Sequence, residues 1–186
     1  MKMKALFALC VVSIVLFAKP SFAQDYFIEK AARRYQASDW PMSSSQNGMV
    51  HHWVPTIPSF VLENAVVVTN LEENEMFEKA SFSWESSSLG EKLDLRMLVT
   101  PDFLTAKQAL LTELGGMQST MMLPRGTNEL DHLGDICYGK LSSVSLVFFV
   151  RNNVFISCCS TFNHSSITNL LISLDDQIKS HLTVNQ

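Results

Sequence analysis

The chain has 186 residues, and its 14 Lys and Arg against 18 Asp and Glu leave a formal net charge of −4. Without the first 23 residues, eleven basic residues remain against 18 acidic ones, so the net charge becomes −7. Nucleic acids and anionic membrane surfaces attract proteins through a basic footprint. The composition therefore argues against both kinds of partner, and the length fits one domain of ordinary size.

The N-terminal stretch has the pattern of a secretory signal peptide. Two lysines precede the apolar run 5–18, which has the length of an h-region and is too short to span a bilayer comfortably. The small residues Ser21 and Ala23 occupy the positions that a signal peptidase reads. We therefore expect residues 1–23 to be removed and residues 24–186 to form one domain, exported to the periplasm or the extracellular space. The alternative is an uncleaved anchor; no later run is long enough to insert into a membrane.

The first half of the mature chain carries signals for a helix, a loop and strands, in that order. Residues 25–37 place their apolar side chains, among them Phe27, on one helical face. Periodicity is lost over 38–59, where Ser, Pro, Asn and Gly dominate, so we expect a long irregular loop there. The acidic stretch 70–75 indicates a turn. Strands are predicted at 60–69, 77–84 and 92–100, and the last two pair as an antiparallel hairpin.

Two further helices are predicted in the second half. Thr100 can cap the first of them, Pro101 fits its first position, and Asp102 suits its positive end. This helix should run to residue 114, before a Gly-Gly pair. Strands should follow at 117–123 and 133–138. Ser165 or Ser166 should cap the last helix, whose apolar stripe consists of Ile167, Leu170, Leu171, Leu174, Ile178 and Leu182.

The stretch 144–159 has the pattern of a β-hairpin. Its turn falls at Asn152-Asn153, since asparagine tolerates the positive φ that such turns need. In this register Arg151 faces Val154, and successive side chains point to alternate faces. Both faces are apolar. The hairpin should therefore be covered on both sides, or be covered on one side and serve as an interface, such as that of a homodimer, on the other.

The order of elements predicts the fold class. Hairpins dominate and there is no strict alternation of strand and helix, which indicates an α+β domain: an antiparallel β-sheet of hairpins with helices packed against it, one of them C-terminal. Over about residues 76–182 this order resembles secreted domains of the PsbP/Mog1 type. The resemblance lies in the order of elements and not in a motif, so it assigns no functional residue.

The candidate ligand-binding residues lie in the 38–59 loop and are Trp40, His51, His52 and Trp53. A tryptophan in an exposed loop can anchor a ligand; the competing interpretation is that each indole packs at the edge of the core. The adjacent histidines could hold a metal ion only with further ligands from His132, His164 or His181. Because HExxH and CxxC motifs are absent, we predict no metal site and no cofactor.

Three cysteines remain in the mature chain: Cys137, Cys158 and Cys159. If the strand at 133–138 turns straight back beside 144–151, Cys137 lies two strands from the other pair, about 9–10 Å away at ~4.8 Å per strand. That separation exceeds the reach of a disulfide. Cys158 and Cys159 are neighbours in one strand, so their side chains point to opposite faces and do not pair with each other. We therefore predict three buried thiols without a disulfide, and burial raises a thiol pKa instead of activating it.

No motif in the sequence assigns a catalytic residue. GxSxG, SxxK, P-loop and GxGxxG patterns are all absent. We expect a non-enzymatic binding or accessory domain whose ligand is a protein or a small molecule. The alternative is a small hydrolase-like enzyme that uses histidines or carboxylates near the 38–59 loop.

Overall fold

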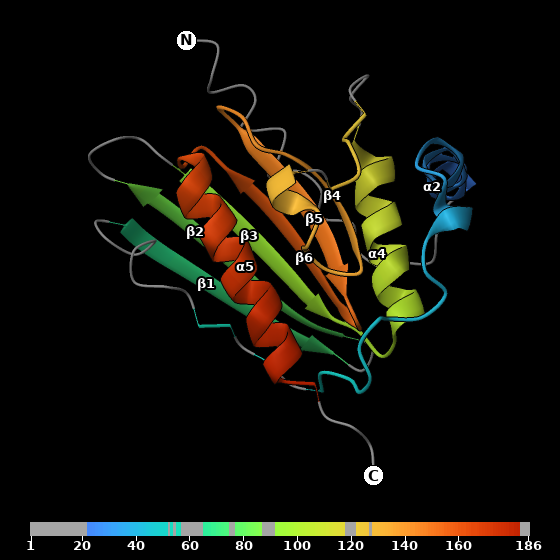
Figure 1. The fold of residues 1–186 in the computed structure, drawn as a ribbon, viewed down its shortest axis with the longest axis horizontal. Coiled ribbons are helices and arrows are strands. Elements are labelled where there is room, and N and C mark those ends of the chain that lie inside the picture. The colour runs from blue at the N-terminus through green and yellow to red at the C-terminus, as the bar shows by residue number, and fades with distance from the viewer. Residues whose placement is uncertain are drawn as a thin grey trace.

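The computed structural model describes residues 22–51, 53, 55–56, 65–74, 77–86, 92–117, 122–126 and 128–182. These residues form a six-stranded sheet in which every neighbouring pair is antiparallel, in the order β1-β2-β3-β6-β5-β4 (Figure 1). The strands are β1 (Ala65–Asn74), β2 (Phe77–Ser86), β3 (Lys92–Val99), β4 (Ile136–Lys140), β5 (Ser145–Arg151) and β6 (Val154–Ser160). The helices are α2 (Phe22–Arg34), α4 (Phe103–Gly116) and α5 (His164–Ser180), with 3-10 turns η1 (Ala37–Asp39) and η2 (Asn128–Leu130). The predicted α+β class is confirmed.

The sheet consists of two meanders that meet at its centre. β1, β2 and β3 follow one another across one half, and β4, β5 and β6 cross the other half. β3 joins β6 antiparallel, from Leu93 opposite Ser160 to Val99 opposite Val154. Because α4 connects β3 to β4, the chain crosses from the centre of the sheet to its far edge and then returns strand by strand.

The central hairpin forms in the predicted register. Arg151 pairs with Val154, and the pairing continues regularly to Leu146 opposite Cys159. Asn152 adopts a φ of 52°, so one residue of the turn takes the predicted left-handed conformation. Every residue of β6 is buried. Turn chemistry and period-two alternation thus act together to place this hairpin at the heart of the core.

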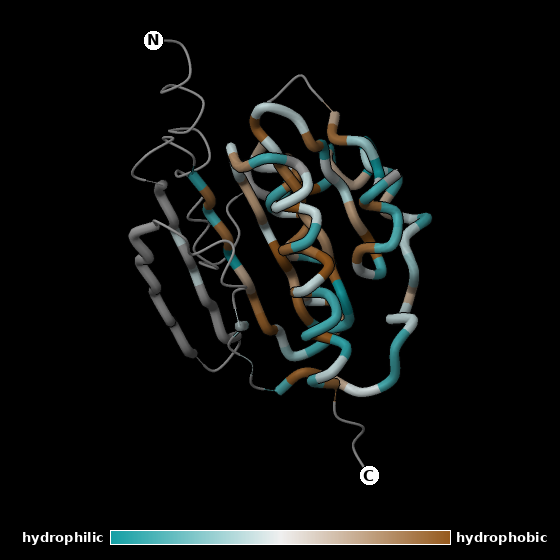
Figure 2. The backbone as a smooth tube through the Cα atoms, turned by 60° about the vertical axis from the view of Figure 1, so that its left-hand side comes forward, coloured by the Kyte–Doolittle hydropathy of each residue, from teal (hydrophilic) through white to brown (hydrophobic). Residues whose placement is uncertain are grey.

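Helices cover both faces of this hairpin, and a homodimer through an apolar sheet face stays a prediction. On one face, residues of β3, β5 and β6 pack against the apolar stripe of α5, which is fully buried from Ile167 to Ile178, while Leu182 beyond the helix is partly buried. On the other face, Phe148, Val150 and Phe155 pack against α4. Figure 1 shows α5 lying across the sheet, and Figure 2 shows hydrophobic residues concentrated along the central strands. Each sheet face therefore buries its own apolar cluster.

Helix α2 packs on α4 and joins the apolar cluster on that face of the sheet. A Cβ on Gly115 would meet the Phe27 carbonyl oxygen at 3.0 Å, so the two helices approach each other closely there. Ala31 of α2 is buried, and so is Tyr35 just after it, whose ring packs edge-on against Tyr138 of β4 with centroids 5.0 Å apart. Phe27 is 50% exposed, contrary to the prediction. An i, i+4 row winds by about 40° per step around a helix, so Phe27 turns away from the face that Tyr35 occupies.

Several boundaries differ from the prediction, among them the end of α4, which includes both glycines and lies at Gly116 instead of residue 114. β1 continues through the acidic stretch to Asn74, where Glu72 pairs with Lys79 and only residues 75–76 separate β1 from β2. β4 begins at Ile136 and not at 133, after a glycine with positive φ at Gly134. Met117 and residues 122–124 belong to no strand, so the described part of 117–123 is not the predicted strand. The predicted strand at 60–64 lies outside the described residues.

Both helix caps are also two or three residues away from the predicted ones. The Asp102 carboxylate accepts a 2.7 Å hydrogen bond from the Thr105 N–H and caps α4, while the Thr100 hydroxyl donates to the Asn153 carbonyl at 2.9 Å. Asn163 caps α5 by accepting from the Ser166 N–H at 2.9 Å. Asp and Asn cap at least as well as Thr and Ser. Helix starts rich in such residues therefore contain several competing caps.

Candidate functional site at the tip of the central hairpin

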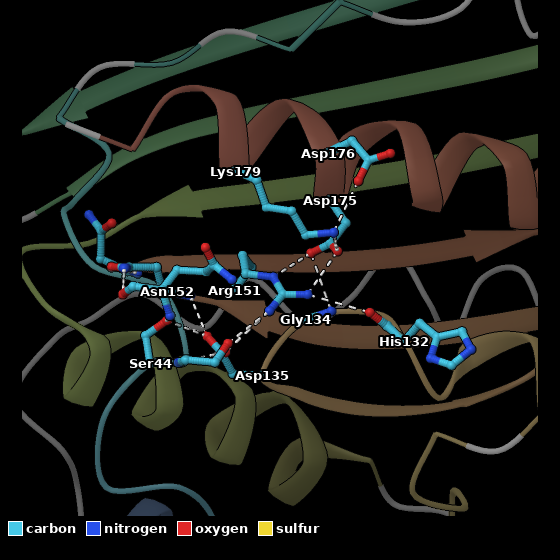
Figure 3. A network of polar contacts seen from close by, with 12 residues as sticks. Ser44, His132, Gly134, Asp135, Arg151, Asn152, Asp175, Asp176 and Lys179 are labelled. Carbon is cyan, nitrogen blue, oxygen red and sulfur yellow. Dashed lines mark hydrogen bonds and ion pairs between the residues drawn. The ribbon is translucent and has the colours of Figure 1, made fainter. Parts of the chain in front are cut away.

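A buried arginine lies between two buried aspartates where β5 ends. The Arg151 guanidinium donates two parallel hydrogen bonds to Asp175 of α5, from Nε at 2.7 Å and from Nη2 at 2.9 Å. Its Nη1 lies 3.2 Å from Asp135, the residue before β4. The three side chains are 6%, 3% and 1% exposed, in the order Arg151, Asp175, Asp135. Figure 3 shows the guanidinium held between the two carboxylates. Charges this deeply buried are stable only when they are paired.

The placement of these charges follows from the periodicity of their elements. Arg151 is two and four residues after Phe149 and Val147, so it shares the sheet face that α5 covers. Asp175 is one helical turn after Leu171, inside the apolar stripe of α5. Sequence reasoning missed this pair, although both signals were available: an arginine on an apolar strand face and an aspartate inside an apolar helix stripe.

Asp135 also fastens the loop that precedes β1 to the hairpin. It accepts hydrogen bonds from the Asn152 N–H at 2.8 Å, the Ser44 hydroxyl at 2.7 Å and the Ser45 N–H at 3.0 Å. Burial acts to raise the pKa of Asp135, but the hydrogen bonds from Asn152, Ser45 and Ser44 outweigh it and hold that pKa below its ordinary value. Asp135 therefore stays ionised opposite Arg151.

Gly134 is required beside this carboxylate. It has a φ of +65°, and a Cβ there would lie 2.4 Å from the Val150 carbonyl oxygen. The Gly134 N–H donates a hydrogen bond to the Asp175 carboxylate at 3.2 Å. The Asp135 N–H donates to the Val150 carbonyl at 2.6 Å. Only glycine combines this conformation with so close an approach.

Lys179 connects the buried pair to the surface. Its ammonium lies 2.9 Å from Asp175 and 3.0 Å from Asp176, and its side chain is 38% exposed. Hydrogen bonding to Asp175 raises the pKa of Lys179, with burial acting in the opposite direction and Asp176 adding to the increase. Two cations and two buried carboxylates thus alternate from the loop to the outer side of α5.

The two turn asparagines complete the attachment of the loop. Asn152 Nδ2 donates to the Gly48 carbonyl at 2.7 Å. Asn153 Nδ2 donates to the carbonyls of Val50 at 2.7 Å and Thr100 at 2.6 Å, and its Oδ1 accepts from the Val50 N–H at 2.9 Å. Asn153 is 1% exposed. These residues are asparagines for two reasons: the turn needs one at positive φ, and their amides hold the loop.

This cluster is chemically closed. Each of the three guanidinium nitrogens of Arg151 has a protein acceptor, because Nη2 also lies 3.4 Å from the His132 carbonyl and Nη1 lies 3.3 Å from the Ser45 hydroxyl. The Asp135 carboxylate accepts from several groups at once. Side chains so fully paired are not available to bind or activate a substrate. The cluster acts as a brace that joins the loop, β5 and α5.

The predicted site residues do not come together. Trp40 is 3% exposed and packs in the cluster under α4, with its Nε1 donating to the Tyr138 hydroxyl at 2.9 Å. Trp53 is 4% exposed and packs in the cluster under α5. Both indoles thus have the packing role of the competing interpretation. His51 is exposed and His52 lies outside the described residues. Ligand binding by these four residues stays a prediction.

Trp53 has one unusual feature. Within the described part of the chain, its Nε1 is the one buried side-chain nitrogen or oxygen without a hydrogen-bond partner. Its ring centroid lies 6.1 Å from that of His181, near the end of α5. The segment is anchored there through Thr56, whose N–H donates to the Gln177 side chain at 2.8 Å and whose carbonyl accepts from it at 2.8 Å.

The cysteines occupy the predicted positions. Cys137 of β4 pairs with Phe149, while Cys158 lies in β6 between Val147 and Leu95, so two strand spacings separate them. All three thiols of the described chain are buried and none forms a disulfide. Burial, with a smaller contribution from a nearby aspartate, raises the pKa of Cys137 and of Cys158 to about 12. These thiols are protonated at neutral pH and poorly suited to nucleophilic chemistry.

Two wider searches complete the description of the site. Among the described residues, no three His, Cys, Asp or Glu side chains are grouped so that they could hold a metal ion. None of the described helices has the length and apolarity needed to cross a bilayer. The resemblance to PsbP/Mog1 domains stays a prediction from element order. Compared with protein-family models, curated proteins and solved structures, the chain has no significant match in any of the three.

Proposed function

We propose that this chain is an exported, non-enzymatic binding or accessory domain that acts on a protein or small-molecule ligand through the outer side of α2 and α4. The carrying observation is the distribution of exposed apolar side chains. Among described residues the large exposed hydrophobics are Tyr26, Phe27, Met42, Leu104, Met122 and Ile172. Five of these six belong to α2, α4 or the segments packed beside them, which we call the α2–α4 side. Concentrated exposed apolar groups are typical of interaction sites.

Three of the five lie on α2 or α4, and the other two lie next to residues that contact α4 or its cluster. Tyr26 and Phe27 lie on α2, and Leu104 lies on the first turn of α4 with 71% of its surface exposed. Met42 is 91% exposed and follows Pro41, whose carbonyl accepts from Lys107 of α4 at 2.8 Å. Met122 precedes Leu123, a member of the cluster under α4. These side chains are therefore displayed by ordered backbone.

The hydrolase alternative has less support. Acid–base catalysis needs a group with an accessible proton in reach of a substrate. The deeply buried carboxylates Asp135 and Asp175 are occupied by Arg151, and burial raises the pKa of the Cys137 and Cys158 thiols. The low basic content also disfavours nucleic acid as the ligand.

Site-specific photo-cross-linking tests the proposal. A photoreactive phenylalanine analogue replaces Phe27 or Leu104 in the exported protein, and the matched control carries it at Ile172, which is 43% exposed on α5. We expect adducts with the same ligand from positions 27 and 104 and none from position 172. Adducts that are absent, or that form equally well from position 172, would contradict a binding role for the α2–α4 side.

A pair of substitutions gives a second readout. The double variant Tyr26→Ser/Phe27→Ser should lose the adduct formed from position 104, whereas Ile172→Ser should retain it. Because all three side chains are exposed, both variants should melt within about 2 °C of the wild type, as surface changes seldom exceed 0.5 kcal/mol. An adduct from position 104 that still forms in the double variant would show that Tyr26 and Phe27 do not contribute to binding.

A further inference from the structure

The two edge strands of the sheet, β4 and β1, differ in whether another described segment pairs with their outer side. The outer edge of β4 is covered by the segment before η2: Gly126 N–H donates to the Cys137 carbonyl at 2.7 Å, and Gly139 N–H donates to the Pro124 carbonyl at 3.0 Å. Arg125 forms a β-bridge with Tyr138 between them. β1 forms the opposite edge and, among the described strands, pairs with β2 alone (Figure 1). Unpaired edges are templates for another strand.

From Ala65 to Leu71, β1 lacks the features that usually block such an edge, and its two charged residues, Glu72 and Glu73, lie near its end. All ten of its residues pair with β2 in one continuous register, so the strand contains no bulge. Its sequence, AVVVTNLEEN, has no proline and no lysine, and it is rich in β-branched residues. Natural edge strands are commonly protected by bulges, prolines, lysines or short length. A regular ten-residue edge without them is suited to pairing.

The register shows which backbone groups point outward. Asn74 and Phe77 form the last pair of the β1–β2 register and are separated by two residues in the chain, and residues that close a hairpin in this way exchange backbone hydrogen bonds with each other. The direction of the backbone groups alternates along a strand, so even-numbered residues of β1 bond to β2. The outward N–H and C=O groups then belong to Ala65, Val67, Thr69, Leu71 and Glu73.

We propose that β1 pairs with β1 of a second copy of this chain, antiparallel about a two-fold axis at Thr69. This register pairs Thr69 with itself, Val67 with Leu71 and Ala65 with Glu73, each through outward-pointing backbone groups. The interface is isologous and closed, as in most homodimers. The six-stranded sheets of the two copies would join at their β1 edges into one twelve-stranded sheet.

The charges of β1 select this partner and this direction. In the antiparallel register, Glu72 and Glu73 lie opposite Val66 and Ala65, and no acid faces another acid. A parallel copy in register would place the like charges side by side, which is destabilising. The faces of the central hairpin are already covered by α4 and α5, so the edge remains for a second copy. Self-pairing uses no residue of the α2–α4 side.

A cysteine at the symmetry axis tests the register. In Thr69→Cys the two introduced thiols would lie on directly opposed residues, about 5.5 Å apart at Cα, within disulfide range. We expect a covalent dimer on mild oxidation, or with a short bis-thiosulfonate linker. In the matched control Val66→Cys, the two positions are offset by six residues, about 20 Å at ~3.3 Å per residue, and no dimer should form. The native thiols are buried and do not compete.

The mass in solution tests the assembly without an added thiol. Light scattering should give twice the mass of one chain for the wild type and for Thr69→Val. For Thr69→Lys it should give the mass of a single chain, because the substitution places two ammonium groups opposite each other at the axis. Circular dichroism of each variant checks that the fold is retained. A monomeric wild type, including one that binds only an added extended peptide, would overturn the proposal. So would equal cross-linking from Thr69→Cys and Val66→Cys.

Discussion

Single residues at the hairpin tip carry charge where their elements are otherwise apolar. Arg151 ends a strand whose side chains on the same face are Val147 and Phe149, and Asp175 interrupts the stripe of α5. Neither charge would be tolerated alone, because desolvation of an unpaired ion costs several kcal/mol. Buried ion pairs are weak sources of net stability, but breaking one is costly. Their value here is positional: Asp135 fixes the loop against β5.

Asp135→Asn should destabilise the protein by about 3–5 kcal/mol at neutral pH, because it leaves a buried guanidinium with one carboxylate fewer. The folded-state pKa of Asp135 is lower than the unfolded value near 3.8. The stabilisation by this carboxylate is therefore fully present above about pH 4 and is lost as the pH falls through the folded-state pKa. Urea unfolding at several pH values measures the difference, which should shrink below pH 4.

The control for this change is Asp176→Asn. Asp176 also forms an ion pair, with Lys179, but its side chain is 65% exposed. Solvent screens such a pair, so the change should cost at most about 0.5 kcal/mol. A difference between Asp135→Asn and wild type that stays constant down to pH 2 would show that the Asp135 charge does not stabilise the fold.

At the scale of elements, the hairpin of β5 and β6 organises the domain. It supplies both apolar clusters, one for each helix layer, and its turn holds the loop that precedes β1. α5 and α4 depend on it more than on each other, since the sheet lies between them. Loss of packing at the centre of this hairpin should therefore destabilise the whole domain.

Phe149→Ala tests this dependence. Phe149 is fully buried beneath α5, and removal of its ring should cost about 3–5 kcal/mol through lost transfer free energy and the cavity that remains. Leu104→Ala is the matched control, because Leu104 is 71% exposed on α4 and should change stability by less than about 0.5 kcal/mol. Denaturant unfolding compares the two. A cost below about 1 kcal/mol for Phe149→Ala would be incompatible with its place in the core.

At the scale of the whole molecule, the strand order decides the chemistry of the cysteines. Because β5 lies between β4 and β6, Cys137 is too far from Cys158 and Cys159 for a disulfide. The fold can therefore pass through an oxidising compartment with its thiols intact. Their burial protects them as much as their separation does.

Thiol titration of the unfolded mature protein without reductant should find three reactive groups. In the native state these groups should react slowly at pH 8, since burial raises the pKa of Cys137 and Cys158 to about 12. Detection of one group would mean that a disulfide exists. A bond from Cys137 to either of the others would require β4 and β6 to be neighbours, against the observed order.

Processing is a separate prediction for the whole chain. Intact-mass measurement on exported protein should show Gln24 as the first residue, with the 23 residues before it removed. A mass that retains them would contradict the secretion argument. Replacement of Ala23 by a large residue should reduce cleavage, because the peptidase reads a small side chain there.

How much could be predicted from the sequence depended on the distance over which each signal acts. The hairpin register, the stripe of α5 and the α+β class were predicted correctly, because alternation, turn residues and helical periodicity act within a few residues. Caps and strand ends were less certain where Thr100 and Asp102, or Asn163 and Ser165, compete for the same role. The extent of β1 was wrong because its acidic residues have low strand propensity, and pairing with β2 overrides it.

The sequence by itself thus determined most of the elements, the buried faces of α5 and of the central hairpin, and the separation of the cysteines once the meander was assumed. Only the tertiary structure decided that β3 joins β6, that Trp40 and Trp53 pack on opposite faces of the sheet, and that Arg151 meets Asp135 and Asp175. Those contacts join residues from 16 to 98 positions apart, such as Arg151 with Asp135 and Trp40 with Tyr138. No local pattern encodes them, because they depend on which elements pack together when the core closes.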